Sequence, residues 1–227
     1  MDMLPLSFER ARDVMVDGQL RPNKVTDERL LDAARRLRRE DFLPPERQPF
    51  AYIDEDVSLA PLAPGRVLME PVVLARLIQA LAPEREEKVL VIGAGTGYGA
   101  ALIAMACGAR VTALEENEAL AAFARSALAR HAPTVRLVTG PLARGLAAEA
   151  PWGAILIEGA VAAIPEEITA QLQPESGRLA TVLNEGLPMG RAVLGERTPY
   201  GLALRPLFDC ATPHLPAFAP RPAFVFP

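Results

Sequence analysis

The sequence has few of the residues that build metal centres, disulfide frameworks or nucleic-acid surfaces. Its 227 residues include only two cysteines, Cys107 and Cys210, and two histidines. None of them shows a metal-ligand spacing, so we expect no metal and two buried, reduced thiols. Lys and Arg number 24 against 28 Asp and Glu, giving a net charge of −4. This balance excludes a general nucleic-acid binder, which needs a basic face.

Long hydrophobic runs and targeting patterns are also scarce. The uncharged stretch 89–109 has the length of a membrane span, but five glycines interrupt it and it divides into a strand, a loop and a helix. The N-terminus lacks the basic and then apolar pattern of a signal peptide. We therefore expect a cytoplasmic protein with no membrane and no nucleic-acid partner.

Alternating strands and helices dominate the chain from residue 88 onward. This alternation predicts an α/β fold with a doubly wound, mostly parallel, seven-stranded Rossmann-like sheet. Half of the residues are hydrophobic and only 5% are aromatic, so the core is expected to be Ala, Leu and Val. The expected strands are 88–92, 110–114, 135–139, 153–158, 177–183, 191–195 and 200–209, and the expected helices are 98–107, 117–131 and one that Pro165 opens.

The first seventy residues have a different character. We expect helices at 6–21 and at about 26–37, an irregular proline-rich segment at 43–67, and a helix that Pro71 opens. The arginine run at 35–39 is interpreted as a solvated helix end. The predicted organisation is an N-terminal helical extension with an active-site loop at 1–70 and a cofactor-binding domain at 71–227, in a single compact unit.

A glycine-rich turn follows the first strong strand. Its Gly-x-Gly-x-Gly spacing lets backbone approach a ligand closely and presents helix N–H groups to it. The dinucleotide fingerprint fails when counted from Gly93, because the sixth position is Tyr98. Counted from Gly95 it fits, but the loop then starts two residues late. The predicted cofactor-binding residues of this turn are Gly93, Ala94, Gly95, Thr96, Gly97 and Tyr98.

An acid at the end of the next expected strand supports a nucleoside ligand. Glu115 lies about twenty residues beyond the glycine turn, where a carboxylate accepts both ribose hydroxyls. Glu116 is the less favoured neighbour, and a simple helix-terminus charge is the alternative interpretation of Glu115. In an open parallel sheet the turn at 139–142, with Pro141 and Leu142, and the residue Glu158 belong to the same crevice.

Several landmarks together resemble one family, the protein-L-isoaspartate O-methyltransferases. The resemblance runs from about Met15 to Val182, and its landmarks are 15–21, 41–44, 51–52, the glycine turn with its tyrosine, 150–157 and 176–179. It implies S-adenosylmethionine as the cofactor and a peptide or protein acceptor. The family's reaction is methylation of the α-carboxylate of an isoaspartyl residue, a carboxylate already ionised at neutral pH.

The sequence departs from that family in the loop that meets the acceptor. Where the family has a Thr-Ile-Ser-Gln/Ala-Pro signature, this chain has Val67-Leu68-Met69-Glu70-Pro71, so both hydroxyls are absent. Met69 takes the position of the serine, and Glu70 places a negative charge beside an anionic acceptor. The acid that the family carries after its third strand is also missing. The candidate catalytic residues are therefore Glu70 and Glu158, with Met69 at the serine position.

Three alternatives remain beside a repair methyltransferase. The first is a methyltransferase for another acceptor, a peptide, a protein or a small molecule. The second is a non-catalytic protein that binds S-adenosylmethionine. The third is an NAD-type oxidoreductase, for which no Tyr-x-x-x-Lys or comparable pair is present.

Overall fold

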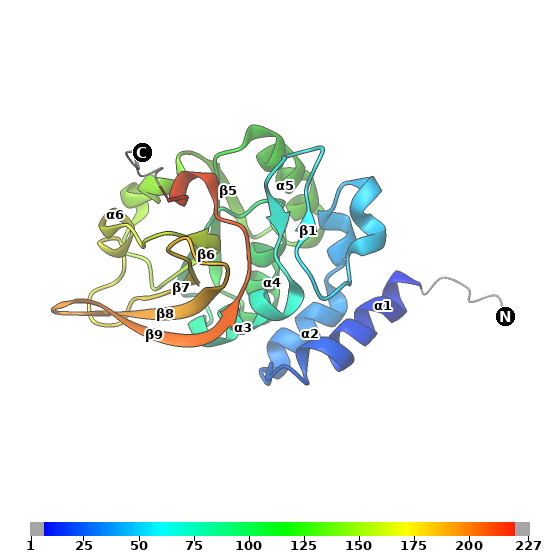
Figure 1. Ribbon diagram of the computed structural model, residues 1–227, viewed down its shortest axis with the longest axis horizontal. Coiled ribbons are helices and arrows are strands. Elements are labelled where there is room, and N and C mark those ends of the chain that lie inside the picture. The colour runs from blue at the N-terminus through cyan, green and yellow to red at the C-terminus, as the bar shows by residue number, and fades with distance from the viewer. Residues whose placement is uncertain (1–6, 221–227) are drawn as a thin grey trace, which may run out of the picture.

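The computed structural model describes residues 7–220 and has a central sheet with helices on both faces (Figure 1). The strand order is β5-β4-β3-β6-β7-β8-β9; the first five strands are parallel, and β8 and β9 run antiparallel to their neighbours. These strands are β3 (Lys88–Ile92), β4 (Arg110–Glu115), β5 (Arg136–Thr139), β6 (Ala154–Val161), β7 (Arg178–Leu183), β8 (Gly190–Thr198) and β9 (Gly201–Cys210). The predicted seven-stranded, doubly wound sheet is confirmed.

Helices and one small hairpin complete the described chain. The helices are α1 (Phe8–Met15), α2 (Glu28–Arg36), α3 (Pro71–Leu81), α4 (Tyr98–Cys107), α5 (Glu118–His131) and α6 (Glu166–Thr169). The short strands β1 (Val57–Ser58) and β2 (Val67–Leu68) pair antiparallel within the segment expected to be irregular. None of the helices among residues 7–220 is long and apolar enough to cross a membrane.

Most element boundaries agree with the sequence pattern, and the exceptions have local causes. The expected helix 6–21 is α1 followed by a π-helical turn, and its first residue lies outside the described part. The helix after Pro165 is a single turn. Strand β6 continues to Val161, three residues past its expected end, because Ala160 and Val161 still pair with β7 after a register shift. Pro206 lies on the edge strand β9, where a missing N–H does not interrupt the sheet.

The two faces of the sheet bury different partners. Along β3, Val89 and Val91 pack into the cluster formed with α3, α4 and α5, whereas Leu90 and Ile92 pack into a second cluster on the other face. This alternation follows from the two-residue period of a strand. Burial of each such side chain stabilises the fold by about 1.5–3 kcal/mol.

The N-terminal extension packs against α4. Phe42 meets the ring of Tyr98 edge-on, with 5.4 Å between the ring centroids. Arg39, expected at a solvated helix end, is instead completely buried, so that expectation was wrong for this residue. Its Nε donates to the Ala51 carbonyl and its Nη2 to the Met69 carbonyl, both at 2.7 Å. The guanidinium ties three chain segments together, which no local sequence pattern specifies.

Candidate functional site

The strand order reverses between β3 and β6, and three of the predicted site features lie at this side of the sheet: the glycine turn, Glu115 and Glu158. The glycine turn follows β3, Glu115 ends β4 and Glu158 lies within β6. Ligands of open parallel sheets bind at such a reversal, because the loops on either side diverge there. The structure therefore brings the glycine turn and the two acids to one place.

Glycine is required in the turn by its backbone conformation. Gly93, Gly95 and Gly97 have φ values of +74°, +56° and +94°, in the left-handed region. The N–H of Gly95 donates to a carboxylate oxygen of Glu115 at 2.8 Å, which fixes the turn against the end of β4. Ala94 and Thr96 are buried, and the Thr96 hydroxyl has no hydrogen-bond partner among the described residues.

Glu115 has the position expected for a ribose-binding acid, but its carboxylate is already fully engaged. In addition to the Gly95 N–H, the backbone N–H groups of Glu116 and Asn117 donate to the Glu115 carboxylate, at 3.0 and 2.9 Å. Arg66 forms a two-pronged ion pair with the same carboxylate, with N–O distances of 2.9 and 2.8 Å. Glu115 is completely buried, and Arg66 is only 7% exposed.

Sequence reasoning did not identify Arg66 as part of the site. The residue lies 49 positions before Glu115 along the chain and belongs to no periodic pattern. Only the path of the β1–β2 hairpin brings it to the end of β4.

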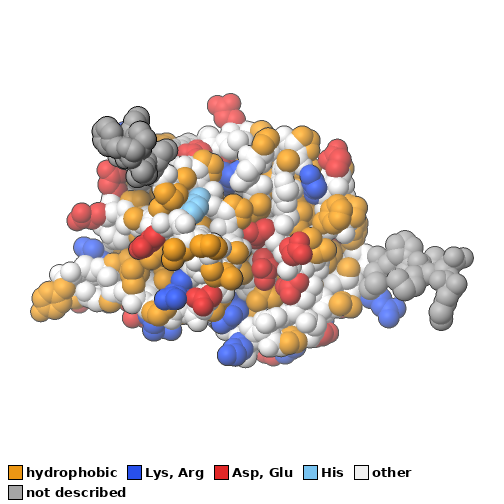
Figure 2. All heavy atoms as spheres, viewed as in Figure 1, with side chains coloured by type: hydrophobic (Ala, Val, Ile, Leu, Met, Phe, Trp, Pro, Cys, Tyr) orange, Lys and Arg blue, Asp and Glu red, His pale blue; other side chains and the backbone are white. Residues whose placement is uncertain are grey.

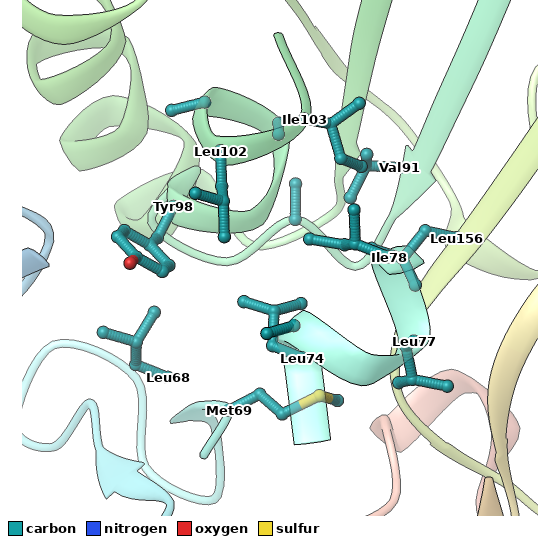
Figure 3. Packing of buried hydrophobic residues seen from close by; sticks show 14 of the residues in the cluster. Leu68, Met69, Leu74, Leu77, Ile78, Val91, Tyr98, Leu102, Ile103 and Leu156 are labelled. Atoms are coloured by element: carbon teal, nitrogen blue, oxygen red, sulfur yellow. The ribbon is translucent and has the colours of Figure 1, made fainter. Parts of the chain in front are cut away.

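The other predicted cofactor residues divide between the crevice edge and the core. Glu116 is half-buried, and its carboxylate accepts the Leu142 N–H at 3.4 Å. Leu142 is fully buried in the second cluster, and the neighbouring Pro141 is exposed. Tyr98 packs among core side chains beside Leu68 and Leu102 (Figure 3). Its ring is therefore part of the packing between α4 and the N-terminal extension.

Met69 is a packing residue in this fold. It is 1% exposed, and its side chain lies beside Leu74 of α3 (Figure 3). The position that the serine takes in the family therefore holds a thioether directed into the core. A thioether is at most a weak acceptor, so this side chain offers no donor to an acceptor group.

Glu70 precedes α3 without capping it through its side chain. It occupies the N-cap position, but its carboxylate makes no capping hydrogen bond, and its own N–H donates to Asp56 at 2.7 Å. Partial burial and the nearby acids Asp54, Asp56 and Glu55 raise the pKa of Glu70 to about 7. Acidic side chains gather beside β1 on this face (Figure 2). The loop therefore carries excess negative charge.

Glu158 has the most strongly perturbed carboxyl near the crevice. Burial raises its pKa to about 8, and the positive charges of Arg39 and Arg66 oppose the shift. Its Oε2 atom is buried and has no hydrogen-bond partner among residues 7–220. The carboxyl lies against Gly99, where a β-carbon would have no room. A carboxyl of this kind is largely protonated at neutral pH.

These features define the class of the protein, a Rossmann-like methyltransferase fold with the family's glycine turn and strand-end acid. The family model for protein-L-isoaspartate(D-aspartate) O-methyltransferase matches residues 11–189. The chain therefore belongs to the protein-L-isoaspartate(D-aspartate) O-methyltransferase family, and family membership indicates S-adenosylmethionine as the cofactor.

Curated relatives carry the family's name. A protein-L-isoaspartate O-methyltransferase from Methylorubrum populi is 40% identical over 186 residues, covering 82% of this chain and 84% of the relative. Another from Koribacter versatilis is 35% identical over 209 residues, covering 92% of this chain and 90% of the relative.

Solved structures with the same name share the fold. One protein-L-isoaspartate O-methyltransferase has a TM-score of 0.76 at 22% identity; the match covers 90% of this chain, which spans 65% of that one. A Plasmodium falciparum structure of that description, in complex with S-adenosyl-L-homocysteine, has a TM-score of 0.73 at 17% identity, covering 91% of this chain and 98% of its own.

Side chains of this chain pack closely on the glycine turn and on the neighbouring strand β6. Leu215 lies so close to Gly93 and Gly159 that a β-carbon on either would stand 2.7 or 2.6 Å from it. A small cavity beside them, lined by Gly159, Leu215, Arg66 and Glu158 among others, measures about 10 Å³. A ligand pocket measures about 300–1,000 Å³, so this cavity by itself does not hold a cofactor.

Proposed function

We propose that this chain is an S-adenosylmethionine-dependent methyltransferase whose acceptor is a peptide or protein group other than a free carboxylate. The observation that carries the cofactor part is the placement of Glu115 and the glycine turn together at the strand reversal. These are the elements that hold a ribose and leave main chain accessible to a ligand in folds of this class. Closure of the crevice means that binding requires part of the chain to move.

The acceptor part rests on the loop at 67–71. The family's two hydroxyl positions hold Val67 and Met69, and Met69 is buried in the core. Glu70 and the acids around it make the loop negative, and negative charge repels a carboxylate more strongly as water is excluded. A neutral or cationic acceptor group avoids this repulsion.

Two measurements test the proposal. S-adenosyl-L-homocysteine should raise the melting temperature of the wild type, because a ligand that binds only the folded state stabilises it. Glu115→Gln should abolish this shift, whereas Glu118→Gln, an exposed acid in the first turn of α5, should keep it. Labelled methyl transfer to an isoaspartyl peptide should be undetectable, and transfer to a mixture of cellular proteins should occur.

The outcomes separate the two parts of the proposal. Robust methylation of the isoaspartyl peptide would show that the acceptor part is wrong while the cofactor part stands. If the homologue shifts the melting temperature of neither the wild type nor Arg66→Ala at millimolar concentration, the cofactor part is wrong. The second candidate function, a non-catalytic member of the family, is favoured by the Arg66–Glu115 ion pair and would then take its place. A cytoplasmic location remains a prediction from the sequence.

A further inference from the structure

The side chain of Arg66 occupies the position that a ribose needs on Glu115. Its two terminal nitrogens face the two carboxylate oxygens, which is the pairing that two neighbouring sugar hydroxyls would make. Nη2 also donates to the Gly93 carbonyl at 3.2 Å, so the guanidinium bridges the acid and the glycine turn. With three backbone N–H groups on the same carboxylate, no acceptor position remains for a sugar.

A second internal side chain takes the space above the glycine turn. Leu215 is 3% exposed and packs directly on Gly93 and Gly159. Backbone hydrogen bonds of 3.0 Å hold its segment on β6, from Ala160 to the Pro213 carbonyl and from Leu215 to the Ala160 carbonyl. The bare main chain interpreted as a ligand cradle is therefore used for packing in this conformation.

We propose that Arg66 is an internal substitute for the cofactor's sugar, which closes the crevice in the ligand-free fold and must leave Glu115 before S-adenosylmethionine binds. This inference rests on the proposed function and adds a gate to the same site. The ion pair is the gate, and Leu215 is the second side chain that has to move.

The loop that carries Arg66 is the part able to move. It joins β1 and β2, which are held together by two residue pairs and by one further hydrogen bond, from the Leu59 N–H to the Arg66 carbonyl at 2.9 Å. Glu115, in contrast, ends a strand with a neighbour on each side in the seven-stranded sheet. Gly65 precedes Arg66, is exposed, and has φ +80° with open space around it. Glycine absorbs a change of backbone angle at little steric cost, so a swing of this loop leaves the sheet intact.

The closed form also leaves polar groups unsatisfied. The Thr96 hydroxyl and Oε2 of Glu158 are buried beside the crevice without partners among the described residues. Such groups destabilise the state that buries them, which favours an open form once a polar ligand can replace Arg66. The open form is a minority before the ligand binds, so the measured affinity is lower than that of the open form, in proportion to the fraction of open molecules.

Calorimetric titration of the full-length chain with S-adenosyl-L-homocysteine tests the gate. Arg66→Ala should bind the homologue about 100-fold more tightly than the wild type, because the competitor for Glu115 is gone. Leu215→Ala should tighten binding by a smaller factor of about ten, since it frees space but keeps the ion pair. If Arg66→Ala does not fold, the affinity of Leu215→Ala tests the gate in its place.

Arg178→Ala is the matched control. Arg178 makes the same two-pronged pair with Glu87, at 3.1 and 2.9 Å, at the opposite edge of the sheet. Its removal should leave the affinity for S-adenosyl-L-homocysteine unchanged. A gain in affinity for this variant as large as for Arg66→Ala would overturn the gate, because it would reflect general loosening of the fold.

The remaining outcomes distinguish the gate from the proposed function. Equal, measurable affinities in wild type, Arg66→Ala and Leu215→Ala would overturn the gate and leave the proposed function standing. Binding by none of them would overturn the proposed function. In that case, denaturation of Arg66→Met, Glu115→Gln and the double variant tests whether the ion pair closes the crevice. Changes in the free energy of unfolding that do not add support this closure, and additive changes overturn it.

Discussion

At the scale of single residues, Glu158 links the crevice to the pH dependence of stability. Its pKa in the folded chain is raised to about 8, above the ordinary value of 4.5. Between these values the folded state binds more protons than the unfolded state, so the free energy of unfolding falls as pH rises. Glu70, with a pKa raised to about 7, acts in the same direction. The chain is therefore expected to be more stable at pH 5 than at pH 8.5.

Replacement of Glu158 by glutamine should remove most of this dependence. At pH 8.5, the free energy of unfolding of Glu158→Gln is expected to be about 1 kcal/mol higher than that of the wild type. This difference corresponds to a rise of roughly 2–4 °C in Tm. At pH 5 the two proteins should be close, because the native carboxyl is then protonated. Thermal denaturation at both pH values measures the difference, with Glu118→Gln as an exposed control. A variant that gains equally at both pH values would refute the titration argument.

At the scale of elements, α3 begins at Pro71, the last residue of the acceptor loop, and is followed by a residue with a strained backbone. Pro71 starts the helix at the first-turn position that proline tolerates. Ala82, just past the last residue, has φ +46° and ψ +60°, a left-handed conformation that costs a residue with a β-carbon about 1 kcal/mol. Glycine is the usual residue at this place.

Glycine at position 82 should therefore stabilise the chain. Ala82→Gly is expected to add about 0.5 kcal/mol to the free energy of unfolding, the relief of strain less the greater freedom of glycine in the unfolded chain. Ala104→Gly, within α4, should instead lower it by about 1 kcal/mol. Urea denaturation of both variants measures the contrast, and a loss of stability at position 82 would contradict the strain.

At the scale of the whole molecule, one hydrophobic cluster joins the N-terminal extension to the sheet. It includes Met15, Leu31 and Phe42 from the extension together with Val91 and Leu156 from the sheet. The two parts predicted from the sequence, 1–70 and 71–227, thus share a core within the described residues. The ends of these ranges, 1–6 and 221–227, lie outside the described part.

A shared core predicts that the cofactor-binding part does not fold without the extension. A chain of residues 71–227 should lack near-UV circular dichroism and bind a hydrophobic dye, because the outer face of α4 is exposed. In the full chain, Trp152 fluorescence and far-UV circular dichroism should report one coincident transition. A cooperative transition in the shortened chain would show that the two parts are independent.

Much of the fold and part of the site followed from local sequence signals. Helix α4 has the predicted bounds, because the glycine turn and Gly108 mark its two ends. Glu115 lies where the spacing from the turn placed it. Arg39 was misinterpreted, because four arginines within five residues are typical of a solvated surface. Only the fold shows that one of them is turned inward to bind carbonyl groups of distant segments.

The sequence by itself determined the order of strands and helices, the glycine turn and the acid at the end of β4. These depend on periodicity and on conformations that few residues adopt, both readable from neighbouring positions. The tertiary structure alone decided what fills the crevice. A glycine leaves room equally for a ligand and for a side chain, and a carboxylate accepts equally from a sugar and from a guanidinium. The choice of Leu215 and Arg66 depends on contacts between segments far apart in the chain, which no local pattern records.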